Sequence, residues 1–156
     1  MVQRLGELFE RIDPLIASWM QRWGLLLLRW SLALIFIWFG ALKPFGLSEA
    51  NDLIEATVYW AVSPGWFIVV LGWWEVLIGL CLLWRPLIRV ALALLALQMG
   101  GTFLPLVLVP EATWVQPPWQ PTLAGQYIIK NLVIISAAIV VGGSVRTNPA
   151  QPNPFS

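Results

Sequence analysis

Residues 64–84 read PGWFIVVLGWWEVLIGLCLLW, an apolar run that carries a single charged side chain, Glu75. About 20 apolar residues are enough to cross the hydrocarbon core of a bilayer as a helix. The pair Ser63-Pro64 suits the N-terminus of such a helix, and Arg85-Pro86 suits its end. The run therefore predicts a membrane-spanning helix with a carboxyl group near its middle.

Three further apolar runs flank this one and cover residues 23–42, 87–109 and 123–143. The run over residues 23–42 ends at Lys43-Pro44, and the run over residues 87–109 contains Pro105, which predicts a kink near its end. Continuous Leu, Ile and Val runs lack the alternation of a membrane β-barrel, so strands are not expected. The sequence predicts an all-α fold, a four-helix transmembrane bundle.

The composition supports this environment. The chain has 156 residues, of which 59% are hydrophobic and 11% charged, whereas a soluble domain carries about 25% charged residues. Four spans leave only short loops, which excludes a large soluble catalytic domain. The net charge of +1 gives no reason to expect a nucleic acid partner.

Several kinds of redox and metal site are excluded by residue counts. The sequence has no histidine, which removes imidazole ligation of haem or zinc. Its single cysteine, Cys81, cannot form an internal disulfide or a multi-thiolate cluster, and a packing role is expected for it. We expect no metal site and no covalently bound cofactor.

The arginines predict the orientation of the bundle. All of them fall on one side of the four spans, and the opposite side holds Lys43 and the acidic loops with Glu49, Asp52, Glu55 and Glu111. Because basic residues mark the cytoplasmic side, the sequence predicts a multi-pass protein of the cell (inner, cytoplasmic) membrane with both termini cytoplasmic.

The segments outside the spans divide the chain into three parts. Residues 1–22 alternate apolar and charged side chains at helical spacing, which predicts an amphipathic helix on the membrane surface that docks on lipid or on a neighbouring subunit. It lacks the features of a signal peptide, so we expect it to be retained. Residues 23–143 form the transmembrane domain, and residues 144–156 are predicted to be disordered. A short helix is expected over residues 48–60, with Ser48 as its N-cap.

Polar side chains inside the apolar runs form the candidate site. Glu75 lies about 15 Å deep in its span, and Lys130 lies about 10 Å deep from the outer side of its span, so a polar cluster is expected in the outer half of the bundle. Gly72, Glu75 and Gly79 share one helix face, as do Arg29, Ala33, Phe36, Gly40 and Lys43 in the first span. A buried carboxylate must be paired, protonated or hydrated, so we expect Glu75 to pair with Lys130, Lys43 or both. The candidate residues are Glu75, Lys130, Lys43, Gln98 and Asn131.

Two interpretations of this cluster stay open. It is either a buried ion pair that fixes the helix register and carries no chemistry, or the lining of a cavity that holds a polar ligand head or passes a proton. Arg29 lies apart, close enough to the membrane boundary to extend its guanidinium into water.

Three segments resemble the DoxX-like membrane protein superfamily. They are RWSLALIFIWFGALK (29–43), with an early arginine and Gly-x-x-Lys at its end, GWWEVLIG (72–79) and GQYIIKN (125–131). The last is similar to the branch related to the reactive-chlorine-resistance inner-membrane proteins. The resemblance covers about residues 25–143. It implies a four-helix integral membrane protein associated with membrane redox systems.

The leading hypothesis is a membrane subunit or module of a redox or oxidative-stress system that receives a quinone head or a small oxidised solute at the cluster of Glu75, Lys130, Lys43 and Gln98. Its partners would be the lipid bilayer and other membrane or peripheral redox subunits, or further copies of the chain. No motif for a bound redox centre is present, so the chain would at most be part of a quinone-linked oxidoreductase. The alternative is a non-catalytic assembly subunit. Solute transport is a weaker third class because no inverted repeat is found.

Overall fold

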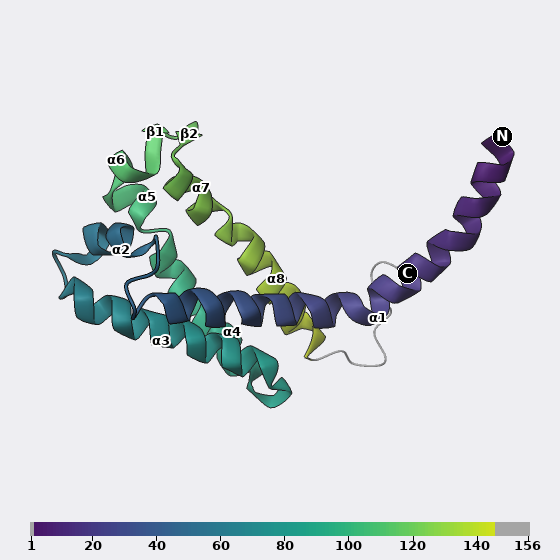
Figure 1. Cartoon of the computed structure of the whole chain (residues 1–156), viewed down its shortest axis with the longest axis horizontal. Helices are drawn as coiled ribbons and strands as arrows, with labels where there is room; N and C mark the ends of the chain where they lie inside the picture. Colours follow the sequence, from purple (N-terminus) through teal and green to yellow (C-terminus); the bar gives the residue numbers. More distant parts are fainter. Residues whose placement is uncertain (1, 146–156) are drawn as a thin grey trace.

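The computed structural model describes the backbone of residues 2–145 and the side chains of residues 12–145. Within this range, four segments are helical, long and apolar enough to cross a membrane, as predicted: Ile12–Leu42, Pro64–Leu83, Arg85–Leu108 and Leu123–Ser144. Figure 1 shows the last three of these segments gathered beside the C-terminal part of the first. The architecture is consistent with a multi-pass membrane protein. The tail predicted to be disordered falls, from residue 146 onward, outside the described residues.

The first helix, α1, runs without interruption from Val2 to Leu42. The predicted boundary between a surface helix and a first span at residue 22 is therefore not a break in the chain. Gly24 and Pro14 both lie inside the helix, and neither ends it: Gly24 only weakens it, and Pro14 removes one backbone hydrogen bond. Figure 1 shows the N-terminal part of α1 projecting away from all other helices. Its placement on a membrane surface stays a prediction, and the side chains of residues 2–11, which carry much of the amphipathic pattern, are not described.

The second span, α3 (Pro64–Leu83), is the most extensively buried of the four. It packs against the C-terminal half of α1, against α4 (Ile88–Thr102) and against α2 (Asn51–Val58). Ser63 stands at its N-cap and Pro64 at its first position as predicted, although the Ser63 side chain makes no capping hydrogen bond. Cys81 is buried in the hydrophobic core, in agreement with a packing role.

Backbones of α1 and α3 touch at two points, which fixes their antiparallel register. A Cβ atom added to Gly72 would lie 2.7 Å from the carbonyl oxygen of Gly40, and one added to Gly79 would lie 2.7 Å from that of Ala33. The predicted small-residue face of α3 is therefore confirmed as the contact with α1. Because both helices rise about 1.5 Å per residue, this register places Arg29 level with the end of α3.

The third and fourth spans are each divided. The third consists of a 3-10 turn at Arg85–Leu87, then α4, then α5 (Pro105–Leu108), so the predicted disturbance at Pro105 is confirmed. The fourth consists of α7 (Leu123–Ile129) and α8 (Asn131–Ser144), which meet at Lys130. The fourth span ends at Ser144, next to the glycine pair at residues 142–143, close to the predicted end.

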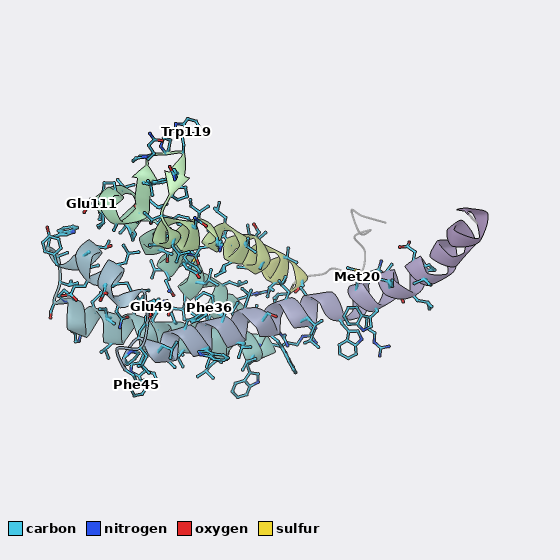
Figure 2. All side chains as sticks on the ribbon, turned by 45° about the horizontal axis from the view of Figure 1, so that its top comes forward. Met20, Phe36, Phe45, Glu49, Glu111 and Trp119 are labelled. Carbon is cyan, nitrogen blue, oxygen red and sulfur yellow. The ribbon has the colours of Figure 1, made fainter. Side chains whose placement is uncertain are left out.

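Short elements cover one end of the bundle, which we call the loop end. They are α2, α5, α6 (Pro110–Thr113) and a two-stranded hairpin of β1 (Trp114–Gln116) and β2 (Gln120–Pro121). Figure 2 shows Glu49, Glu111 and Trp119 at this end, opposite Met20. The hairpin was not predicted. The helix expected over residues 48–60 is shorter, and its N-cap is Ala50, because the Ser48 hydroxyl instead accepts a hydrogen bond from the Ala50 N–H (3.3 Å) ahead of the helix.

Thr122 ties the loop end to the fourth span, and its removal should be measurable. Its hydroxyl accepts from the Gly125 N–H (3.2 Å) as the N-cap of α7 and donates to the Ala112 carbonyl (2.7 Å). We expect Thr122→Ala to lower the free energy of unfolding by about 1 kcal/mol, the usual cost of losing an N-cap. Denaturant unfolding in detergent micelles measures this loss. Ser136→Ala, at an exposed hydroxyl within α8, is the control and should change stability little.

Candidate functional site

Glu75 lies in the middle of α3 and faces the interior of the bundle. The residue is buried, with 8% relative exposure. It shares the α3 face that α1 covers, and a Cβ atom added to Gly40 of α1 would approach the Cβ atom of Glu75 to 2.7 Å. The close approach of the two helices excludes lipid from this side of the carboxylate.

Lys43 directly follows α1 and forms a buried ion pair with Glu75 through Nζ and Oε2. The α1–α3 register explains the pairing, because α1 ends level with the middle of α3 and not with its start. Gly46, with a positive φ of 69°, turns the chain after Lys43 and donates its N–H to the Lys43 carbonyl (3.1 Å). Of the two predicted partners of Glu75, the structure selects Lys43.

Gln98 of α4 gives the Glu75 carboxylate a second hydrogen-bond donor. Its Nε2 donates to Glu75 Oε1 at 2.5 Å, so each carboxylate oxygen receives one donor. We call Lys43, Glu75 and Gln98 the Glu75 cluster. It joins three separate segments of the chain inside the bundle.

Two amide oxygens near this cluster have no donor in the described part of the chain: Gln98 Oε1 and Asn51 Oδ1. Their orientations are fixed, because the amide nitrogen of Gln98 faces a carboxylate and that of Asn51 faces the Lys43 carbonyl (3.3 Å), and both groups only accept. A buried acceptor without a donor costs about 1–3 kcal/mol. Both oxygens are therefore available to a hydroxyl or N–H donor.

Sequence reasoning missed Asn51. It belongs to the loop between the first two spans, and its part in the site depends on that loop folding back over the end of α1. Its position next to Asp52, in a loop rich in acidic residues, gave no signal of a contact with the backbone of Lys43.

Lys130 and Asn131 were predicted in the site, and the structure does not bring them to Glu75. Lys130 is exposed at the junction of α7 and α8, where its Nζ lies 4.9 Å from the centroid of the Tyr127 ring. Asn131 Nδ2 donates to the backbone carbonyls of Tyr127 (3.2 Å) and Ile128 (3.1 Å). These local contacts direct both side chains back onto their own helix.

An apolar groove of about 400 Å³ lies between α4 and α8. Met99, which lines one end of the groove, directly follows Gln98 of the Glu75 cluster along α4. All lining residues are apolar: Leu92, Leu95, Ala96, Met99, Ile135, Ala138, Ile139 and Gly142. A groove of this shape and lining suits a hydrocarbon chain.

The site thus combines a carboxylate, an ammonium group and an amide with an open acceptor, beside an apolar groove. These groups can accept and donate hydrogen bonds and exchange protons at a bound polar head. No cluster of three metal-ligating acidic or thiol side chains occurs in the part of the chain that the structure describes.

No family model, curated protein or solved structure matches this chain. The resemblance to the DoxX-like superfamily therefore stays a prediction that rests on the three segments quoted above.

Proposed function

We propose that this chain is an integral membrane module of a quinone-linked redox or oxidative-stress system, in the cell membrane with both termini cytoplasmic, and that the Glu75 cluster receives the quinone head. The proposal rests on the hydrogen bonding of Gln98. Its amide nitrogen donates to the buried Glu75 carboxylate, while its amide oxygen has no donor in the described part of the chain. The Lys43–Glu75 ion pair alone would serve a purely structural role equally well.

The chemistry of a quinone suits this arrangement. Reduction of a quinone to a quinol adds two electrons and two protons, so the ligand changes from two carbonyl acceptors to two hydroxyl donors. In the quinone state Lys43 would donate to a carbonyl, and in the quinol state the open oxygen of Gln98 would accept from a hydroxyl; Glu75 would pass the two protons to the ligand one after the other. The electrons would come from a partner redox subunit.

The groove between α4 and α8 supports the same ligand class. An isoprenoid tail needs an apolar channel that opens to lipid, and the groove starts at Met99, beside the polar cluster. Head and tail would thus be held by adjacent faces of α4.

Filling the groove should remove the quinone without unfolding the protein. We expect Ala96→Phe, on the groove lining, to lower the amount of quinone that copurifies in mild detergent by about tenfold, equivalent to about 1.4 kcal/mol of binding. Gln98→Leu should have a similar effect because it removes the open acceptor. Quantification of quinone in lipid extracts of the purified protein measures both.

Ala93→Phe is the matched control, because Ala93 is exposed on the same helix and does not line the groove. It should retain the quinone content of the parent protein. Equal quinone content in the Ala96→Phe, Gln98→Leu and Ala93→Phe variants would contradict the proposal.

A non-catalytic assembly subunit is the second candidate, and the N-terminal part of α1 favours it. This part projects from the bundle (Figure 1), and Leu15, Trp19 and Met20 on it are more than half exposed. A helix of this kind suits docking on a larger complex. The same purification distinguishes the two candidates, since a stoichiometric protein partner without quinone supports assembly alone.

A further inference from the structure

Arg29 is a half-buried cation near the level at which α3 ends. In α1 it lies on the same stripe as Ala33 and Phe36, which are 0% and 5% exposed. Its Nε atom is buried and has no hydrogen-bond partner in the described part of the chain. Arg29 as a whole is half-buried, so its guanidinium is accessible to an anion from outside the bundle, which would also supply the acceptor that Nε lacks.

Two further arginines lie at the same level. The register that pairs Gly40 with Gly72 and Ala33 with Gly79 brings Arg29 opposite Leu83, at the end of α3. Arg85 follows in the 3-10 turn, and Arg89 lies in the first turn of α4. We call this region, with Arg29, Arg85 and Arg89, the arginine end. Figure 1 shows the turn between α3 and α4 and the end of α8 gathered beside the middle of α1 at this end.

No acidic side chain in the described part of the chain neutralises the arginine end. Glu75 is ten residues, or about 15 Å, from Arg85 along α3 and is already paired with Lys43. Asp13 is about 24 Å from Arg29 along α1. The other acids of known position belong to the loop end: Glu49, Asp52, Glu55 and Glu111. The anion must therefore come from outside this part of the chain.

A second apolar groove, of about 340 Å³, starts at the arginine end and runs between α1 and α3. Leu83, two residues before Arg85, is the member from α3. The members from α1 extend over about 15 Å of helix: Leu27, Trp30, Ser31, Leu34 and Ile37. An acyl chain whose head lies at the arginines would follow this groove into the membrane.

We propose that the arginine end binds an anionic phospholipid, with its phosphate held by Arg29, Arg85 and Arg89 and one acyl chain in the groove between α1 and α3. Guanidinium groups bind phosphate oxygens through paired, charge-assisted hydrogen bonds. A bilayer supplies phosphodiester groups where apolar helices meet water, the position of these arginines. The site is separate from the Glu75 cluster, and the inference does not depend on quinone binding.

Native mass spectrometry of the full chain in mild detergent tests the proposal. The probes are phosphatidylglycerol and phosphatidylcholine with identical acyl chains, and inorganic phosphate as competitor. We expect phosphatidylglycerol to bind at least about tenfold more tightly than phosphatidylcholine. Arg29→Gln should weaken the binding of phosphatidylglycerol by about tenfold, the scale of one lost charge-assisted contact. Inorganic phosphate should displace the lipid poorly because it lacks the acyl chain.

Arg22→Gln is the matched control, because Arg22 is an exposed arginine of the same helix whose guanidinium lies over the ring of Trp23 (5.7 Å). It should bind phosphatidylglycerol like the parent protein. Circular dichroism verifies folding, and Arg85→Gln, at an exposed position, replaces Arg29→Gln if the latter does not fold. Three outcomes would each overturn the proposal. The first is equal binding of the two lipids, and the second is full displacement of the lipid by phosphate. The third is phosphatidylglycerol binding by Arg29→Gln, or by its replacement, that equals the binding by Arg22→Gln.

Discussion

Gly72→Ala and Gly79→Ala are each expected to destabilise the bundle by about 3 kcal/mol, the upper range for overpacking a core. The added methyl group of either variant would lie 2.7 Å from a backbone carbonyl oxygen of α1. A backbone oxygen within a helix cannot move aside as a flexible side chain can, so the two helices must separate. Separation would also pull Lys43 away from Glu75.

Denaturant unfolding in detergent micelles measures the loss, and two other glycines provide the control. Gly100 and Gly101 of α4 have open space where a Cβ atom would be added. Alanine is favoured over glycine inside a helix by about 0.5–1 kcal/mol, so Gly100→Ala and Gly101→Ala should be neutral or slightly stabilising. If Gly72→Ala proves as stable as Gly100→Ala, the close crossing of α1 and α3 is incorrect.

The same crossing illustrates what the sequence could and could not predict. Helix periodicity is local, so the spacing of Gly72, Glu75 and Gly79 was sufficient to predict their shared buried face. Which lysine meets Glu75 depends on how far α1 slides along α3, which no local pattern encodes. Lys130 was an equally good candidate by depth alone, yet its helix turns it outward.

The N-terminal region shows the opposite difficulty. A change in composition near residue 22 predicted two elements, but composition reports the environment of a helix and not its continuity. Gly24, close to the boundary, weakens a helix without ending it, so the helical hydrogen bonds continue from one environment into the next. The small hairpin at residues 114–121 escaped prediction because its strands are too short for a recognisable alternation.

The final prediction concerns the ion pair itself. Lys43→Met leaves the Glu75 carboxylate buried without its cation and should cost about 3–5 kcal/mol, the usual penalty for breaking a buried pair. Glu75→Gln leaves the buried Lys43 ammonium without its anion, with a similar expected loss. In the double variant, the amide at position 75 still reaches Gln98 and no charge is buried, so most of the stability should return.

A double-mutant cycle in detergent micelles measures this coupling. Lys130→Met is the matched control, because Lys130 is exposed and has no ion pair in the described part of the chain; it should change stability by less than about 0.5 kcal/mol. Additive losses in the double variant would contradict the pairing of Lys43 with Glu75. The double variant also separates the two interpretations of the cluster. If it is stable but no longer copurifies with quinone, the charges serve the ligand, whereas a stable variant that retains quinone assigns them to helix register alone.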